Sequence, residues 1–216
     1  MTMRPIRIIG DPVLRTPCEP VTSFDAELRA LVTDLMDTLL GAPGRAGVAA
    51  PQIGVSAQVF VYDADGHRGH LINPTLELSD EQQTDDEGCL SIPGLYFPTT
   101  RAQHATAHGF NQHGEPVTIT GSGFLARALQ HETDHLSGRL YVDTLRGDTR
   151  RRALREIRAG QFAPRDRCPT RHHPNPPDQR PRRRRNQMPA APSTTNTSAE
   201  QHNALTSTPK LCHAPP

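Results

Sequence analysis

The spacing of hydrophobic residues predicts an amphipathic helix near the start of the chain. Leucine and valine recur every three or four positions up to residue 40, and charged residues occupy the opposite face. Ser23 or Asp25 can cap this helix at its N-terminus. Before it, the short apolar run Ile6–Ile9 ends at the turn-forming residues Gly10–Pro12. The pattern is typical of a helix that packs one face against a core.

Shorter patterns in the middle of the chain predict β-strands. Four segments form two predicted hairpins: residues 57–62 with 70–78, and residues 101–110 with 116–120. Their turns are Asp63–Gly66 and Asn111–Gly114, which are rich in turn-forming residues. Between the hairpins, Asp80–Asp86 is acidic and polar, and we expect a loop there.

Two further helices are predicted in the second half of the chain. Residues 122–137 have the apolar content of a buried helix, and Gly138 can end it. Residues 148–161 predict a last helix with an apolar side and a side rich in arginine: Arg150, Arg151, Arg152, Arg155 and Arg158. The order of elements predicts an α+β fold, with short antiparallel strands around the central helix and the N-terminal and C-terminal helices packed outside.

Composition divides the chain at about residue 162. Residues 1–162 hold 15 arginines and 20 acidic residues, a net charge of −5, whereas residues 163–216 hold nine basic and three acidic residues, a net charge of +6. Eleven of the last 54 residues are proline, and too few are aliphatic to offset the entropy of an ordered chain. We therefore expect a folded domain over residues 1–162 and a disordered Pro/Arg/Ser/Thr-rich tail over residues 163–216.

The cysteines and the apolar runs indicate a cellular compartment. The four cysteines, Cys18, Cys89, Cys168 and Cys212, show no paired spacing, which argues against a disulfide framework. The N-terminus lacks the apolar run of a signal peptide, and no segment is long and apolar enough to cross a membrane. We expect a cytoplasmic protein that does not bind membranes.

The segment Gln130–Leu136 carries the clearest candidate chemistry. In a helix, His131 and His135 project from the same face, with Glu132 beside them, and this HExxH pattern can bind one metal ion. The alternative is a helix that merely contains these residues. The apolar residues just before the segment predict that the helix is buried. Buried imidazoles and a buried carboxylate are costly unless they are paired or bind a metal, so we favour a metal site.

Two histidines leave the metal short of ligands, and the sequence offers several further candidates. These are Glu156, Asp143, His104, His108, His113 and Cys89. A carboxylate would make an ordinary metallopeptidase site. We prefer Cys89, because the short residues around it suit a close approach, although a lone cysteine is usually an inert buried thiol. The glycine-rich segment 41–54 contains Gln52 as its only amide, and by itself it favours a tight turn into a core strand.

Three segments together resemble the peptide deformylase family. They occur in that family's order and with similar spacing: Gly47–Gly54 (GVAAPQIG), Glu87–Ser91 (EGCLS) and Gln130–Leu136 (QHETDHL). The resemblance covers about residues 5–162, which would form the catalytic domain, and leaves the tail outside. It implies a metal-dependent hydrolase that removes the N-formyl group from the formyl-methionine of nascent polypeptides and releases formate.

The resemblance also implies roles for individual residues. Cys89, His131 and His135 would hold one divalent metal ion, Fe(II) by preference, with Zn(II), Ni(II) or Co(II) also able to bind. Glu132 would act as general base and then as acid, and Gln52 with the backbone N–H of Leu90 would form the oxyanion hole. The residues expected to line the substrate site are small: Gly47, Gly88, Ala46 and Ala128.

Two positions depart from the family pattern, and two other functions remain open. Arg45 replaces a glycine at the entry to the first segment, and Arg127 stands where many members have an aliphatic residue near the methionine pocket. Glu87 and Arg101 are candidates for a pair that braces the Cys89 segment or for a surface pair without that role. Asp134 could hold the free N–H of a histidine ligand, but we expect it to face solvent. The alternatives are a zinc endopeptidase with a carboxylate ligand, or a module that contacts the ribosome or RNA through the basic helix and tail.

Overall fold

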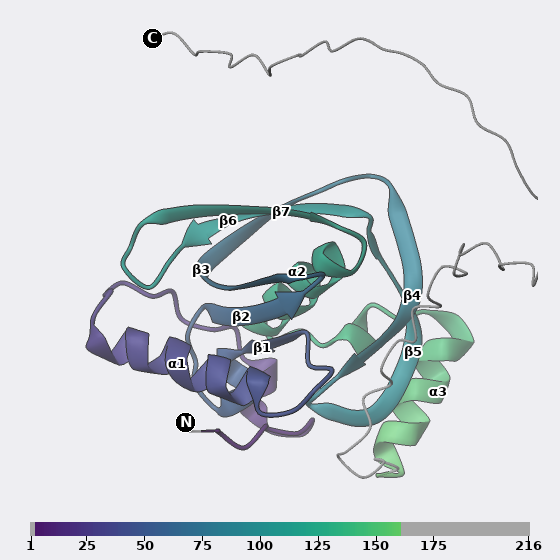
Figure 1. Cartoon of the computed structure of the whole chain (residues 1–216). Coiled ribbons are helices and arrows are strands. Elements are labelled where there is room, and N and C mark those ends of the chain that lie inside the picture. The colour runs from purple at the N-terminus through teal and green to yellow at the C-terminus, as the bar shows by residue number, and fades with distance from the viewer. Residues whose placement is uncertain (1–2, 161–216) are drawn as a thin grey trace, which may run out of the picture. The chain divides into compact units, whose positions relative to one another are not determined.

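The computed structural model describes residues 3–160, so the expectation of a disordered tail over residues 163–216 lies outside the described part. These described residues form three helices and seven strands, whose arrangement is drawn in Figure 1. In order they are α1 (Ala26–Leu40), β1 (Gly47–Ala49), β2 (Val59–Ala64), β3 (His67–Leu78), β4 (Gln82–Cys89), β5 (Ile92–Ala102), β6 (His104–Phe110), β7 (Pro116–Ser122), α2 (Gly123–Leu136) and α3 (Gly147–Arg158). Short 3-10 helices cover Pro12–Arg15, Ala50–Ile53 and Tyr141–Asp143.

The strands form two antiparallel sheets, which confirms the predicted α+β class. One sheet has the order β1-β2-β3-β6-β7, and the other consists of β4 and β5. Both predicted hairpins are present, as β2 with β3 and β6 with β7. Helix α1 also follows the prediction: the Asp25 side chain accepts hydrogen bonds from the backbone N–H groups of Glu27 and Leu28, both at 3.0 Å.

The loop predicted over Asp80–Asp86 is wrong, because most of this segment belongs to β4. Its polar side chains alternate between an exposed and a partly buried face, and every residue from Gln82 to Gly88 pairs with a residue of β5. Thr84 and Thr100 hydrogen-bond across the pair at 3.0 Å. A strand that is solvated on one face needs few apolar residues, which is why composition suggested a loop.

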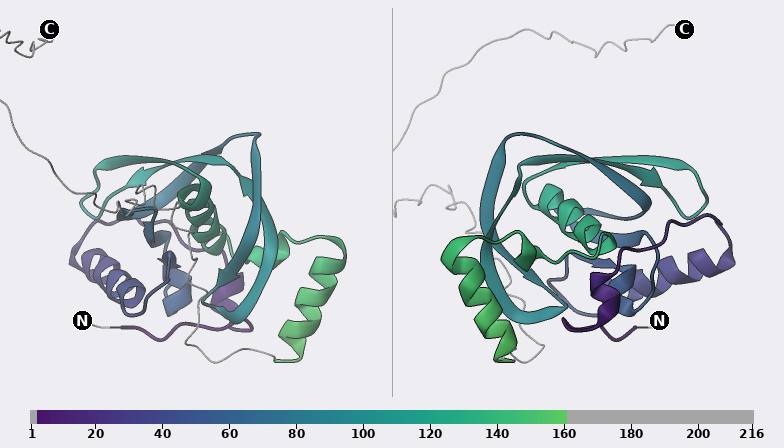
Figure 2. Two further views of the ribbon diagram at one scale, coloured as in Figure 1. Left: turned by 45° about the vertical axis from the view of Figure 1, so that its right-hand side comes forward. Right: turned by 180° about the vertical axis from the view of Figure 1, so that it is seen from behind.

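Helix α2 is packed on nearly all sides. Its residues from Leu125 to Gln130 are all buried, as are Glu132, His135 and Leu136. One core cluster packs α2 against β2, β3 and β6, and a second packs α1 against β1 and β2. A third joins β5 to the segment 140–145 and to α3. Figure 2 shows α1 and α3 on opposite sides of α2.

Within the part of the chain that the structure describes, no helix has both the length and the apolar content needed to cross a membrane.

Candidate metal centre

Three potential metal ligands from two elements meet at the start of the β4–β5 turn. One ligand atom from each of Cys89, His131 and His135 lies within 4.8 Å of the others, and the Cys89 Sγ is 3.3 Å from the His135 Nε2. Cys89 ends β4, and the two histidines are one turn apart on α2. Among residues 3–160, this is the only group of three or more His, Cys, Asp or Glu side chains placed for a shared ion. Glu156, a rival candidate, lies on α3 beside Arg152.

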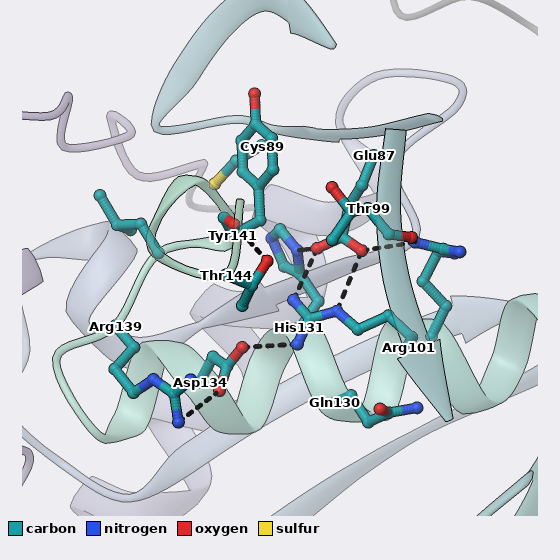
Figure 3. Close-up of polar contacts among 12 residues, drawn as sticks. Glu87, Cys89, Thr99, Arg101, Gln130, His131, Asp134, Arg139, Tyr141 and Thr144 are labelled. Carbon is teal, nitrogen blue, oxygen red and sulfur yellow. Dashed lines mark hydrogen bonds and ion pairs between the residues drawn. The ribbon is translucent and has the colours of Figure 1, made fainter. Parts of the chain in front are cut away.

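Glu87 links the cysteine strand to the histidine helix. It lies two residues before Cys89, and its Oε1 accepts a hydrogen bond from the His131 Nδ1 at 2.7 Å. The Arg101 guanidinium donates to both carboxylate oxygens, at 2.7 and 3.1 Å (Figure 3). Burial would raise the pKa of Glu87, but His131 and Arg101 hold it well below its usual value. Glu87 therefore stays charged and orients the imidazole, as outer-shell carboxylates do in metal sites.

The buried pair between Glu87 and Arg101 agrees with the bracing role considered from the sequence. Their side chains are only 4% and 6% exposed, so this is no surface pair. Asp134 was expected to face solvent, but it is mostly buried and accepts a hydrogen bond from the Arg101 Nη1 at 2.6 Å. Neither carboxylate could be placed from local spacing, because the partner that they share, Arg101, comes from β5.

Arg127 neither faces solvent nor stands unpaired in a pocket. It is 3% exposed, and its Nη1 donates to the Glu87 Oε2 at 2.8 Å and to the carbonyl oxygen of Thr99 at 3.0 Å. Arg45, the other departure from the family pattern, donates through its Nη1 to the carbonyl oxygen of Thr38 near the end of α1. Both arginines therefore make hydrogen bonds within the fold.

Glu132 lies against the glycine-rich segment. It is 3% exposed, its Oε2 is buried without a protein partner in the described part of the chain, and burial raises its pKa to about 7. A Cβ atom on Gly47 would lie 2.3 Å from the Glu132 Oε1, so only glycine fits here without displacing the carboxylate. Gly47 thus has a steric role that the sequence pattern did not indicate.

The surroundings shift the pKa values of the two histidines in opposite directions. Burial lowers the pKa of His135 well below its usual value, and the adjacent His131 lowers it further. Burial also opposes a charged His131, but its hydrogen bonds to Cys89 and Glu87 outweigh that effect and raise its pKa. The imidazole of His131 also stacks on Tyr141, with ring centroids 6.3 Å apart.

Gln52 lies beside the ligand cluster and not in a remote turn. Its Oε1 accepts a hydrogen bond from the Ala49 N–H at 2.9 Å, which aims the Nε2 at the Cys89 Sγ, 3.6 Å away, and at the Ser91 Oγ, 3.3 Å away. Leu90 and Ser91 form the turn between β4 and β5. The Ser91 N–H lies 3.4 Å from the same sulfur, a contact that no sequence signal predicted.

The remaining predicted substrate residues occupy different surroundings. Ala46 precedes β1, and its carbonyl oxygen accepts a hydrogen bond from the Asp63 N–H at 2.8 Å. Ala128 is 5% exposed and belongs to the core cluster around α2. Gly88 lies between Glu87 and Cys89, where a Cβ would be 2.2 Å from the Tyr96 ring. Their contact with a substrate stays a prediction.

The cluster fits a transition-metal or zinc ion. One thiol and two imidazoles are donors that such ions take in proteins, and Glu87 already occupies the second nitrogen of His131. The fold also buries the Glu132 Oε2 without a protein partner among the described residues. Buried polar atoms of this kind are costly unless something else binds them.

Comparison with known proteins decides the family. The family model for polypeptide deformylase matches residues 3–151. The chain belongs to the peptide deformylase family. It is 61% identical over 163 residues to a peptide deformylase from Acidothermus cellulolyticus, covering 76% of this chain and 90% of that protein. A peptide deformylase from Parafrankia is 52% identical over 165 residues, with the same coverage.

Solved structures agree with this assignment. A crystal structure of a peptide deformylase from Legionella pneumophila has a TM-score of 0.68 and 40% identity, and the match covers 74% of this chain and 95% of that one. The deformylase from Thermotoga maritima has a TM-score of 0.65 and 36% identity, with 68% and 100% covered. The chain is thus a metal-dependent hydrolase of the deformylase family, and it acts on formylated nascent peptides.

Proposed function

We propose that Cys89, His131 and His135 hold the divalent metal ion with which this deformylase removes the N-formyl group and releases formate. The observation that carries the proposal is the meeting of one sulfur and two imidazole nitrogens within 4.8 Å, from β4 and α2. A thiolate among the ligands favours softer ions, and we propose Fe(II) as the preferred ion, with Zn(II), Ni(II) or Co(II) as substitutes.

A bound ion would polarise the formyl carbonyl and lower the pKa of a water molecule to about 7. Glu132 follows His131 in the sequence and is buried, which supports its proposed role as the group that takes a proton from the attacking water. The same carboxyl group then returns the proton to the leaving amine nitrogen. The absence of a side chain at Gly47 leaves room for the Glu132 carboxylate in its present position.

Gln52 and the backbone N–H of Leu90 would bind the carbonyl oxygen as it gains charge. The Gln52 amide is already oriented by the Ala49 N–H and lies next to Cys89. A preorganised donor of this kind typically contributes about 2.7–4 kcal/mol to the transition state. The peptide is proposed to lie along four small residues, Gly47, Gly88, Ala46 and Ala128. Their small side chains would leave room for the peptide backbone.

Formate release from a formyl-methionyl peptide tests this assignment. Protein loaded with Fe(II), Ni(II) or Co(II) should release formate, and a lack of turnover with all three ions would refute the proposal. Glu132→Gln should lower kcat by about 10²–10⁴-fold, the usual contribution of a general base, while the bound metal stays near the wild-type level. Glu77→Gln, at a side chain that is 79% exposed, is the matched control and should retain full activity.

The zinc endopeptidase alternative finds no support at Glu156. That side chain lies near Arg152 and is absent from the ligand cluster. We propose that the protein is located in the cytoplasm, where formylated nascent peptides are made. Residues 1–162 are the proposed catalytic domain.

We also propose a weak contact with the ribosome or RNA through α3. The exposed arginines of this helix are Arg151, Arg152, Arg155 and Arg158. Arg151 already pairs with Asp148, and Arg152 lies over the Phe97 ring, which leaves Arg155 and Arg158 as the better candidates. Replacing both with glutamine should weaken co-sedimentation with ribosomes at low salt and reduce the salt slope by about one per residue. Unchanged sedimentation would contradict this contact.

A further inference from the structure

Glu87 is the meeting point of three donors that come from two different elements. Its Oε1 accepts from His131 on α2 and from Arg101 on β5, and its Oε2 accepts from Arg101 and from Arg127 on α2. The four hydrogen bonds measure 2.7, 2.7, 3.1 and 2.8 Å. The carboxylate is therefore fully used, and two guanidinium groups share its charge.

Arg101 and Arg127 differ in what else they hold. Arg101 divides its charge between Glu87 and Asp134, which lies 2.6 Å from its Nη1. Among the described residues, Arg127 has Glu87 as its only carboxylate partner. Its Nη1 also donates to the Thr99 carbonyl oxygen, and its Nη2 is buried without a protein partner in the described part. The hydrogen bonds of the Arg127 guanidinium thus go to Glu87 and to the backbone of β5.

The position of this contact matters for the ligand cluster. Cys89 follows Glu87 by two residues on β4, and His131 follows Arg127 by one helical turn on α2. The ion pair between Glu87 and Arg127 therefore ties the strand that carries the sulfur to the helix that carries the imidazoles. The hydrogen bond between His131 and Glu87 is the second such link, and the apolar contacts of α2 are mainly with the five-stranded sheet and not with β4.

We infer that Arg127 is a positioning residue of the metal centre, which clamps the Cys89 strand to α2 and slows the loss of the ion. The inference rests on the proposed ligand set of Cys89, His131 and His135. Without the Arg127 guanidinium, Glu87 keeps its hydrogen bonds with His131 and Arg101, but β4 and α2 lose one of the two direct links that this carboxylate makes between them. The Cys89 sulfur then samples positions farther from the two imidazoles. Because the sulfur is away from the ion more often, the ion dissociates faster.

The test measures metal loss directly. Protein loaded with Co(II) is mixed with excess EDTA, and the decay of the visible absorption of cobalt bound to thiolate gives the dissociation rate. Arg127→Met keeps the length of the side chain and removes the guanidinium, and it should release Co(II) about ten times faster, at the lower end of outer-shell effects. Arg127→Lys keeps the charge but lacks the planar guanidinium, and its rate of Co(II) release should lie between the rates of the wild type and of Arg127→Met.

Gln130→Met is the matched control. Gln130 is buried on the same helix and makes three hydrogen bonds, to the N–H and the carbonyl of Ala102 and to the carbonyl of Ala126, but none to Glu87. This variant loses buried hydrogen bonds and stability, yet it should release Co(II) at the wild-type rate. Equal acceleration in Gln130→Met and Arg127→Met would show a general loosening of α2 and overturn the inference.

A double-mutant cycle shows whether Arg127 acts through Glu87. In a Glu87→Gln background, Arg127→Met should add no more than about twofold to the dissociation rate, because the clamp is already weakened. If Arg127→Met does not fold, the rate of Arg127→Lys decides, and a wild-type rate overturns the inference. A wild-type protein that binds no Co(II) refutes the ligand set itself, whereas normal binding with an unchanged Arg127→Met rate refutes only the clamp.

Discussion

Replacing Gly47 with alanine adds one methyl group directly against the proposed general base. The new Cβ would lie 2.3 Å from the Oε1, 2.6 Å from the Cδ and 2.7 Å from the Cγ of Glu132. Ordinary contact begins at 3.4 Å, so the carboxylate must retreat by about 1 Å. Because Glu132 is 3% exposed and its helix is packed on nearly all sides, the side chain has to move and the backbone cannot.

The expected cost appears in the rate. A displacement of about 1 Å in a catalytic group can cost about 100-fold, which corresponds to about 2.7 kcal/mol of activation free energy. Overpacking should also lower the free energy of unfolding by about 1–3 kcal/mol. Gly47 is not a proposed ligand, so the metal content should stay at the wild-type level.

The assay compares kcat for formate release with metal content and thermal stability in the same preparation. Gly121→Ala is the control, because its Cβ would lie 2.6 Å from the Cγ of Leu125, a similar crowding away from the cluster. It should lose stability and keep kcat within about twofold, since the overpacking acts on the core alone. A Gly47→Ala enzyme with wild-type kcat, or an equal loss of kcat in both variants, would refute the reasoning.

Three further predictions concern the ligand set, a remote histidine and the tail. Cys89→Ala should lower metal affinity by more than the 100-fold that marks the upper range of outer-shell changes, whereas Cys18→Ala should keep wild-type metal content; an unchanged metal content in Cys89→Ala would remove the sulfur from the site. Burial, then the charge of His113, lowers the pKa of His70, and its Nε2 accepts a hydrogen bond from the Gln112 N–H at 3.0 Å. The neutral His70 side chain therefore stabilises the fold fully when the pH is above its unfolded pKa of 6.5, and this stabilisation is lost as the pH falls below that value. Between about pH 7.5 and about pH 5, the Tm of the wild type should fall further than the Tm of His70→Gln, and equal falls in the two proteins would contradict the reasoning. A chain ending at residue 162 should keep kcat/KM within about twofold, because the cluster and its partners all lie before residue 160, and a large loss would give the tail a role in catalysis.

Local patterns determined the elements that position the site. The helical spacing of leucines and the capping residue Asp25 predicted α1, and the HExxH pattern placed two imidazoles on one face of α2. These features depend on residues a few positions apart, for which backbone geometry dictates the relative placement of side chains. Strand β4 was missed because its exposed face is polar, and only pairing with β5 reveals it.

The sequence by itself could nominate Cys89 as a third ligand, but only the tertiary structure brought it within reach of the two histidines. The tertiary structure also decided what surrounds them. Along the chain, Glu87 and His131 are 44 positions apart, and Glu87 and Arg127 are 40 positions apart. Gly47 and Glu132, which lie against each other, are separated by a still longer stretch of sequence. Such contacts depend on how β1, β4 and α2 pack together, and no local propensity or spacing carries that information.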